Sequence, residues 1–148
     1  MNTIIEFIIP GVPKAMPRCR YRLIKTKSGK QFVHTYTPTQ NIQAWYDIFI
    51  SESLKHKPEK AIEKAIAVEC EFKLPRPKNH FSSKGFLKNS EIYHTKKPDI
   101  DNLFKLILDV LKNLNYFIDD AQIAVANLKK IYPQNNSDCG MKIKIQEL

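Results

Sequence analysis

Hydrophobic positions along the chain predict two helices. The clearest helical pattern spans residues 103–114, where apolar residues recur at intervals of three and four. These are Leu103, Leu106, Ile107, Val110, Leu111 and Leu114. A second pattern, ending near residues 57–58, consists of Ile42, Trp45, Tyr46, Phe49 and Ile50. Its spacing assigns Trp45 and Tyr46 to the core rather than to base stacking.

The second helix also carries a start signal in its sequence. Thr37 is a suitable cap, Pro38 fits the first helical position, and Gln40 completes a capping box. We therefore expect this helix to begin at about residue 38.

Strand patterns occupy much of the remaining chain. Strict alternation over residues 65–74 predicts a half-buried strand, with Cys70 in the core and Glu69 and Glu71 facing solvent. A short isoleucine-rich run at 3–9 predicts a buried strand, and residues 31–36 follow a turn at 25–30. Further strands are expected at 123–132 and 141–145. The sum is one α/β (α+β) domain over residues 1–148, with a mixed sheet of about five strands.

Two segments lack periodicity and are rich in basic residues. In residues 10–22 three prolines favour extended backbone, which would place Arg18, Arg20 and Arg22 on one side, as phosphate contacts require. Residues 75–95 mix basic and aromatic side chains, a pattern that suits nucleic acid, although a flexible loop is the alternative. The DNA-contact candidates are Lys14, Arg18, Arg20, Arg22, Arg76, Lys78, Lys84, Lys96 and Lys97.

The overall charge agrees with a polyanionic partner. The chain has a formal net charge of +9 and a pI near 9.5. Its three cysteines are widely spaced, which excludes a disulfide framework and a structural zinc site of the CxxC type. No signal peptide or membrane-spanning segment is apparent. We expect a cytoplasmic protein with no membrane partner and no small-molecule cofactor.

The candidate chemistry lies in residues 96–105. Pro98 favours extended backbone, in which Asp99 and Asp101 would point the same way and bind one Mg²⁺ ion. The helix expected near Asn102 would offer its positive end to a phosphate, and Lys105 would stabilise developing charge. The alternative is ordinary helix capping with a surface pair between Asp101 and Lys105.

A third carboxylate is available at Asp119-Asp120. The chain must turn back after the helix before either residue can approach Asp99 and Asp101. Adjacent residues in extended chain point apart, so only one of the two is expected to be a ligand. The spacing does not identify which one.

These residues carry a family resemblance. The run Lys97-Pro98-Asp99-Ile100-Asp101-Asn102-Leu103, followed by Lys105, Leu108-Asp109 and Asp119-Asp120-x-Gln122, resembles the signature of the RusA family of Holliday junction resolvases. The Pro10-Gly11-x-Pro13, Arg18-x-Arg20 and Tyr36-Thr37-Pro38 segments resemble longer phage and Gram-positive members.

The resemblance implies a homodimeric, Mg²⁺-dependent endonuclease, with Mn²⁺ as a substitute, that nicks two opposed strands of a four-way DNA junction in recombination, repair or phage DNA processing. It implies metal binding and catalysis by Asp99, Asp101 and Asp120, with Lys105 as the essential lysine and with Asp119 and Asn102 in support. A nucleoid-associated protein of bacterial or phage origin would follow.

Three other functions are compatible with parts of this pattern. Asp-x-Asp pairs also serve metal-dependent phosphatases, but there the motif usually follows an apolar strand, and here Lys96-Lys97-Pro98 precedes it. Glycosyltransferases that use the pair are usually larger. A non-catalytic branched-DNA-binding protein would not need three carboxylates and a lysine. Phe104 and Leu108, beside the core stripe, are expected to pack against a second subunit.

Overall fold

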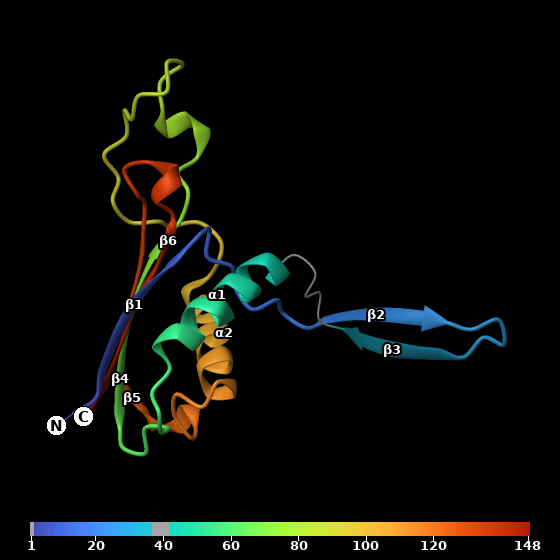
Figure 1. Cartoon of the computed structure of the whole chain (residues 1–148). Coiled ribbons are helices and arrows are strands. Elements are labelled where there is room, and N and C mark those ends of the chain that lie inside the picture. Colours follow the sequence, from blue (N-terminus) through green and yellow to red (C-terminus); the bar gives the residue numbers. More distant parts are fainter. Residues whose placement is uncertain (1, 37–41) are drawn as a thin grey trace.

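The computed structural model describes residues 2–36 and 42–148 and centres on a four-stranded mixed sheet (Figure 1). The strand order is β1-β6-β4-β5, formed by β1 (Ile4–Pro10), β6 (Gly140–Glu147), β4 (Ile66–Lys73) and β5 (Ile123–Ile131). β6 pairs antiparallel with β1 and β4, whereas β4 and β5 are parallel. The predicted strands are thus confirmed, but β1 is an edge strand and is only half buried, with Ile4 and Ile8 exposed.

Two helices cover one face of this sheet: α1 (Gln43–His56) and α2 (Ile100–Asn113). The inward residues of β4 and β6 meet the apolar stripe of α2, in which Leu106 and Leu111 are fully buried. Trp45 is also in the core, at 5% exposure, as its spacing predicted. The start signal at Thr37, Pro38 and Gln40 lies outside the described residues, and the described helix begins at Gln43.

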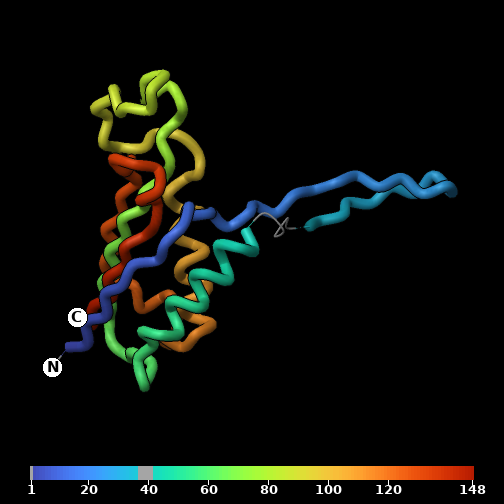
Figure 2. Tube along the Cα trace, turned by 45° about the horizontal axis from the view of Figure 1, so that its top comes forward, coloured from blue at the N-terminus to red at the C-terminus, as the bar shows by residue number. Residues whose placement is uncertain are grey.

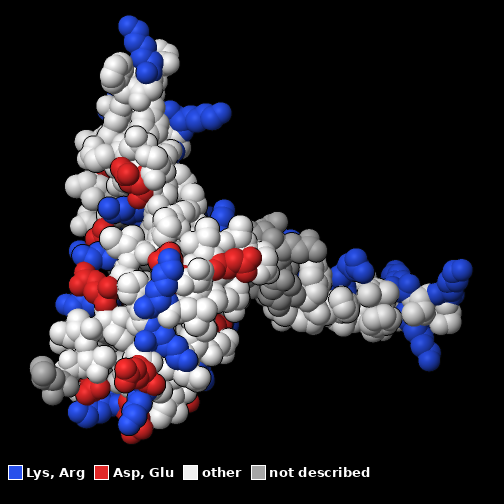
Figure 3. Space-filling model, in the orientation of Figure 1, with Lys and Arg blue, Asp and Glu red and all other residues white. Residues whose placement is uncertain are grey.

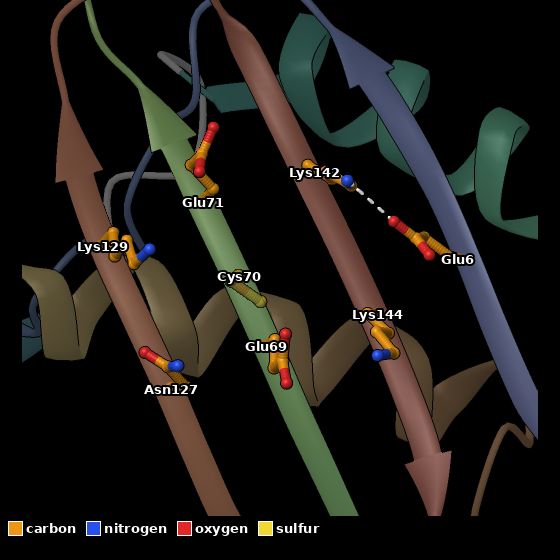
Figure 4. A pocket seen from close by; sticks show the side chains of 8 residues that line it. All are labelled: Glu6, Glu69, Cys70, Glu71, Asn127, Lys129, Lys142 and Lys144. Carbon is orange, nitrogen blue, oxygen red and sulfur yellow. Dashed lines mark ion pairs between the residues drawn. The ribbon is translucent and has the colours of Figure 1, made fainter.

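The opposite face of the sheet carries charged side chains (Figure 4). Glu69 and Glu71 point to this side, as their alternation with the core residues predicted. They lie near Lys142 and Lys144 of β6, and Glu6 of β1 pairs with Lys142 at 2.8 Å. A hollow of about 250 Å³ lies among these residues. Because helices cover the other face, these glutamates are separated by the sheet from the start of α2.

A hairpin arm projects from the body (Figures 1 and 2). It consists of β2 (Arg20–Lys25) and β3 (Gln31–Tyr36), which pair antiparallel as a separate two-stranded sheet. The predicted turn and return strand are confirmed. The mixed sheet has four strands where about five were expected, because the arm forms a sheet of its own and extends away from the main one.

Residues 75–95 form a lobe at the end of the sheet. They include a short 3₁₀ helix, η2 (Lys78–His80), and their backbone joins the end of β5 through His94 N–H to Lys130 O at 2.9 Å and Tyr132 N–H to Ile92 O at 2.8 Å. Two further 3₁₀ turns are η3 (Asp120–Gln122) and η4 (Asn136–Asp138). In the part of the chain that is described, no helix has the length and apolar character needed to cross a membrane.

Candidate active site

Asp99 occupies the position just before α2, on the wall of an open hollow of about 510 Å³. The N-terminal segment before the arm forms the facing wall. The hollow is lined by Ala15, Met16, Pro17, Arg18, Arg20, Lys97, Pro98, Asp99 and Asn102. A carboxylate, the N-terminus of a helix and three cationic side chains therefore meet at one place on the surface.

Two cations hold the Asp99 carboxylate. Lys97 Nζ lies 3.0 Å and Arg18 Nη2 lies 3.2 Å from its Oδ2 atom. The hydrogen bond from Lys97, followed by the charges of Lys97, Arg18 and Lys130, lowers the pKa of Asp99 below its ordinary value despite some desolvation. Its side chain makes no capping hydrogen bond to the helix. The capping alternative is therefore wrong for Asp99, whose charge is directed to the hollow.

Asp101 lies in the first turn of α2, because the helix begins at Ile100 rather than near Asn102. The extended geometry expected for both carboxylates is therefore wrong: Asp99 is extended, but Asp101 is helical. Residues two apart do not face each other on a helix, whereas residues four apart do. Asp101 and Lys105, both exposed, thus share one face of α2 at its N-terminal end.

A lysine at the end of β5 positions this segment. Lys130 Nζ donates to Lys96 O and Pro98 O, both at 2.7 Å, and Met16 N–H donates to Asn102 O at 3.0 Å. Desolvation, its largest influence, lowers the pKa of Lys130. Sequence reasoning missed Lys130 because nothing in the strand pattern distinguishes it from its exposed neighbour Lys129.

Asp119 and Asp120 lie beyond the other end of α2, at the start of η3 and beside Lys112 of the last turn of α2. Asp119 caps η3 in a full capping box with Gln122, and Lys112 Nζ lies 3.1 Å from Asp119 and 3.7 Å from Asp120. A side-chain hydrogen bond with Asp120, then those with Lys112 and the Ala121 amide, lower the pKa of Asp119 to about 2. Asp119 therefore has a structural role as the cap of η3. Asp120 makes fewer contacts, and its distance to Lys112 is longer.

The three predicted metal carboxylates do not meet within one chain. No cluster of three or more acidic, histidine or cysteine ligands exists among residues 2–36 and 42–148. Asp99 and Asp120 are separated by α2, whose 14 residues span about 21 Å. Mg²⁺ commonly uses one or two carboxylates together with water and phosphate oxygens, so a metal site at Asp99 does not require all three carboxylates of one chain.

The predicted DNA contacts fall into three groups. Arg18, Arg20 and Lys97 line the hollow, and Arg22 lies on the arm. Four more are exposed elsewhere on the surface: Lys14, Lys78, Lys84 and Lys96.

The prediction that Arg76 contacts DNA is wrong, because its side chain is buried, with only 6% of it exposed. Its guanidinium donates to Pro133 O at 2.7 Å and Glu91 O at 2.8 Å, and it lies 5.0 Å from the Tyr132 ring centroid. These contacts tie the lobe to the end of the sheet and leave Arg76 unavailable to DNA.

Comparison with known proteins shows the family of this chain. Over 133 residues, the chain is 27% identical to the uncharacterized protein YqaN of Bacillus subtilis, covering 88% of this chain and 89% of that protein. It is 28% identical over 98 residues to the crossover junction endodeoxyribonuclease rusA of Lactococcus phage r1t, covering 66% and 68% respectively. The family model described as endodeoxyribonuclease RusA matches residues 10–146. The chain therefore belongs to the RusA family of endodeoxyribonucleases.

Proposed function

We propose that this enzyme is a divalent-metal-dependent Holliday junction resolvase that makes paired, symmetric nicks in four-way DNA. The observation that carries the proposal is the hollow at the start of α2, where Asp99 lies between Arg18 and Lys97 in a member of an endodeoxyribonuclease family. A carboxylate beside cations and a helix N-terminus suits a metal ion and a phosphate together.

In this proposal, Asp99 and Asp101 hold Mg²⁺, for which Mn²⁺ can substitute. The bound metal would supply Lewis-acid polarisation of the phosphate and an activated water. Arg18 and Lys97, now paired with Asp99, would turn to the phosphate oxygens once a cation replaces them. Lys105, one turn into α2, would stabilise the charge that develops on the scissile group. The product would be a nick with a 5′ phosphate and a 3′ hydroxyl.

A homodimer is part of the proposal for two reasons. The first is that paired nicks need two active sites. The second is that α2 separates Asp120, which follows the helix, from Asp99 of the same chain, which precedes it. In a twofold dimer, Asp120 of the partner subunit would complete each site. The surface near Asp120 suits a second copy, because β5 is an edge strand and both Ile118 (61%) and Val125 (51%) are exposed.

Cleavage of a synthetic four-way junction tests the activity. Wild-type protein should cut with Mg²⁺ and not with EDTA, whereas Asp101→Asn should bind the junction without cutting it. Asp138→Asn, an exposed carboxylate in η4, is the matched control and should cut at the wild-type rate. Equal cleavage by Asp101→Asn and wild type would contradict the assignment.

Mixing two inactive variants tests the shared site. Asp101→Asn and Asp120→Asn should each be inactive alone. In a mixed dimer, one site would carry both substitutions and the other would be intact, so one strand should be nicked. If each chain held its own complete site, the mixed dimer would stay inactive, and the shared-site proposal would fail.

A further inference from the structure

The β2–β3 arm has two chemically different faces. Cross-strand partners share a face, and the register pairs Arg20 with Tyr36, Arg22 with His34 and Ile24 with Phe32. On this face the rings of His34 and Tyr36 stack at 5.9 Å, with 17° between their planes. We call this side the basic-aromatic face, since it presents two guanidiniums beside three rings.

The other side of the arm carries three apolar or aromatic side chains beside the polar Lys25, Gln31 and Thr35. It presents Tyr21, Leu23 and Val33, exposed at 74%, 57% and 62%, with Lys25 near the tip. Two further lysines, Lys27 and Lys30, lie in the turn between the strands. From Arg20 to Tyr36 every charged residue is Lys or Arg. Figure 3 accordingly shows blue side chains along the arm and no red ones in that view.

The arm begins at the wall of the candidate active site. Arg18, which pairs with Asp99, and Arg20, the first residue of β2, both line the hollow. Each strand of the arm has six residues, a length of about 20 Å. That length matches about six base pairs of duplex, and the major groove of DNA admits a two-stranded ribbon.

The exposure of both faces indicates that the arm works against a partner. A lone two-stranded hairpin is marginally stable in water, and a ribbon that buries neither face gains little from packing. The uniformly positive charge, continuous with the hollow, favours a polyanion over a second copy of this basic chain.

We propose that the arm is a second DNA-binding element, lying in a groove of the duplex next to the scissile phosphate with its basic-aromatic face against the DNA. The proposal rests on the proposed function, because it assumes that the cut phosphate lies in the hollow. Arg22 would contact phosphates, and the rings of Phe32 and His34 would contact the groove. Duplex beside the cut would thus be held along the arm.

Junction binding in EDTA, measured by fluorescence anisotropy as a function of salt, is the first test. Arg22→Gln should weaken binding about tenfold and reduce the salt slope by about one ion. Lys25→Gln, on the opposite face of the same strand, should have a smaller effect. Replacing residues 22–34 by Asn-Gly closes the arm after the Tyr21–Thr35 pair and should weaken binding more than Arg22→Gln. Unchanged binding by the shortened variant would overturn the proposal.

Photo-crosslinking separates DNA from a second copy as the occupant. Phe32→benzoylphenylalanine should crosslink to duplex about six base pairs from the cut, and Leu23→benzoylphenylalanine should do so much less. Adducts between two protein chains, or stronger DNA adducts from Leu23, would overturn the proposal. Wild-type cleavage is measured in parallel. Failure of wild type to cut would defeat the proposed function, whereas cutting without arm crosslinks would defeat the arm proposal alone.

Discussion

At the scale of single residues, Asp99 shows how a surface carboxylate is kept charged without burial. Lys97 and Arg18 both reach the same oxygen, Oδ2, so the charged form gains two partners that the protonated form would lose. The contribution of this group to stability is present above its unfolded pKa and is lost as the pH falls through its lowered folded pKa. Asp99 therefore stays charged at a lower pH than an ordinary aspartate does, because its pKa is lowered.

Lys97→Gln should raise the pKa of Asp99, because the hydrogen bond from Lys97 is the largest cause of the lowering. Carboxyl-carbon NMR titration measures this change directly. Asp119, held by Lys112 at the other end of α2, serves as the internal control and should titrate as in wild type. An unchanged Asp99 titration would mean that Lys97 does not hold this carboxylate in solution.

Lys130 should act as a positioning residue. Lys130→Met removes two short hydrogen bonds to the carbonyls of Lys96 and Pro98, and we expect cleavage to slow by about 10–100-fold. Raising Mg²⁺ should restore part of the lost rate, since a displaced Asp99 binds the metal more weakly. Lys129→Met, on the exposed neighbour, is the control. Equal rates for both variants, with Mg²⁺ dependence unchanged, would assign Lys130 no role at the site.

Among the helices and strands, those that bury one face and expose the other were predicted most completely from the sequence. α2 was expected to begin near Asn102 and begins at Ile100, because its first turn precedes the apolar stripe that marks it. β4 and β6 alternate because the sheet has one helix-covered face and one open face. The arm was predicted as a hairpin but not as a separate ribbon, since turn chemistry is local and docking is not.

The contact between α1 and the segment after α2 offers a stability test. Tyr116 Oη donates to Ser53 O at 2.6 Å, while the buried Ser53 hydroxyl has no hydrogen-bond partner among the described residues. Tyr116→Phe should destabilise the fold by about 1 kcal/mol, and Ser53→Ala should leave it unchanged or stabilise it by up to about 1 kcal/mol. Urea unfolding measures both. A marked loss of stability in Ser53→Ala would show that its hydroxyl has a partner in solution.

At the scale of the whole molecule, the parts of the site that sequence reasoning missed are the long-range ones. The family resemblance implied a single cluster of Asp99, Asp101 and Asp120. The parallel pairing of β4 and β5 instead carries the start of β5, with Asp120, to the far end of α2. Arg76 was likewise placed on the surface by local composition, whereas tertiary contacts bury it. Neither the position of Asp120 nor the burial of Arg76 can be predicted from a few neighbouring residues, because both depend on tertiary contacts.

The basic surface of the whole chain makes binding salt-dependent. With a net charge of +9, we expect junction affinity to fall steeply as salt rises from about 50 to 200 mM, by about 10³-fold for some six phosphate contacts. Titrations at several salt concentrations with EDTA give the slope. An affinity independent of salt would contradict a role for the basic surface in binding DNA.

Helix α2 has one further consequence if the partner subunit supplies Asp120. Asp99 and Asp120 of one chain then belong to different active sites, because they lie at opposite ends of α2. A twofold axis places one active site near each end of the helix. The length of α2, about 21 Å, then sets the separation of the two cuts. Lengthening α2 by one turn, about 5.4 Å, would move the nicks out of step with the junction's symmetric strands before it altered the chemistry at either one.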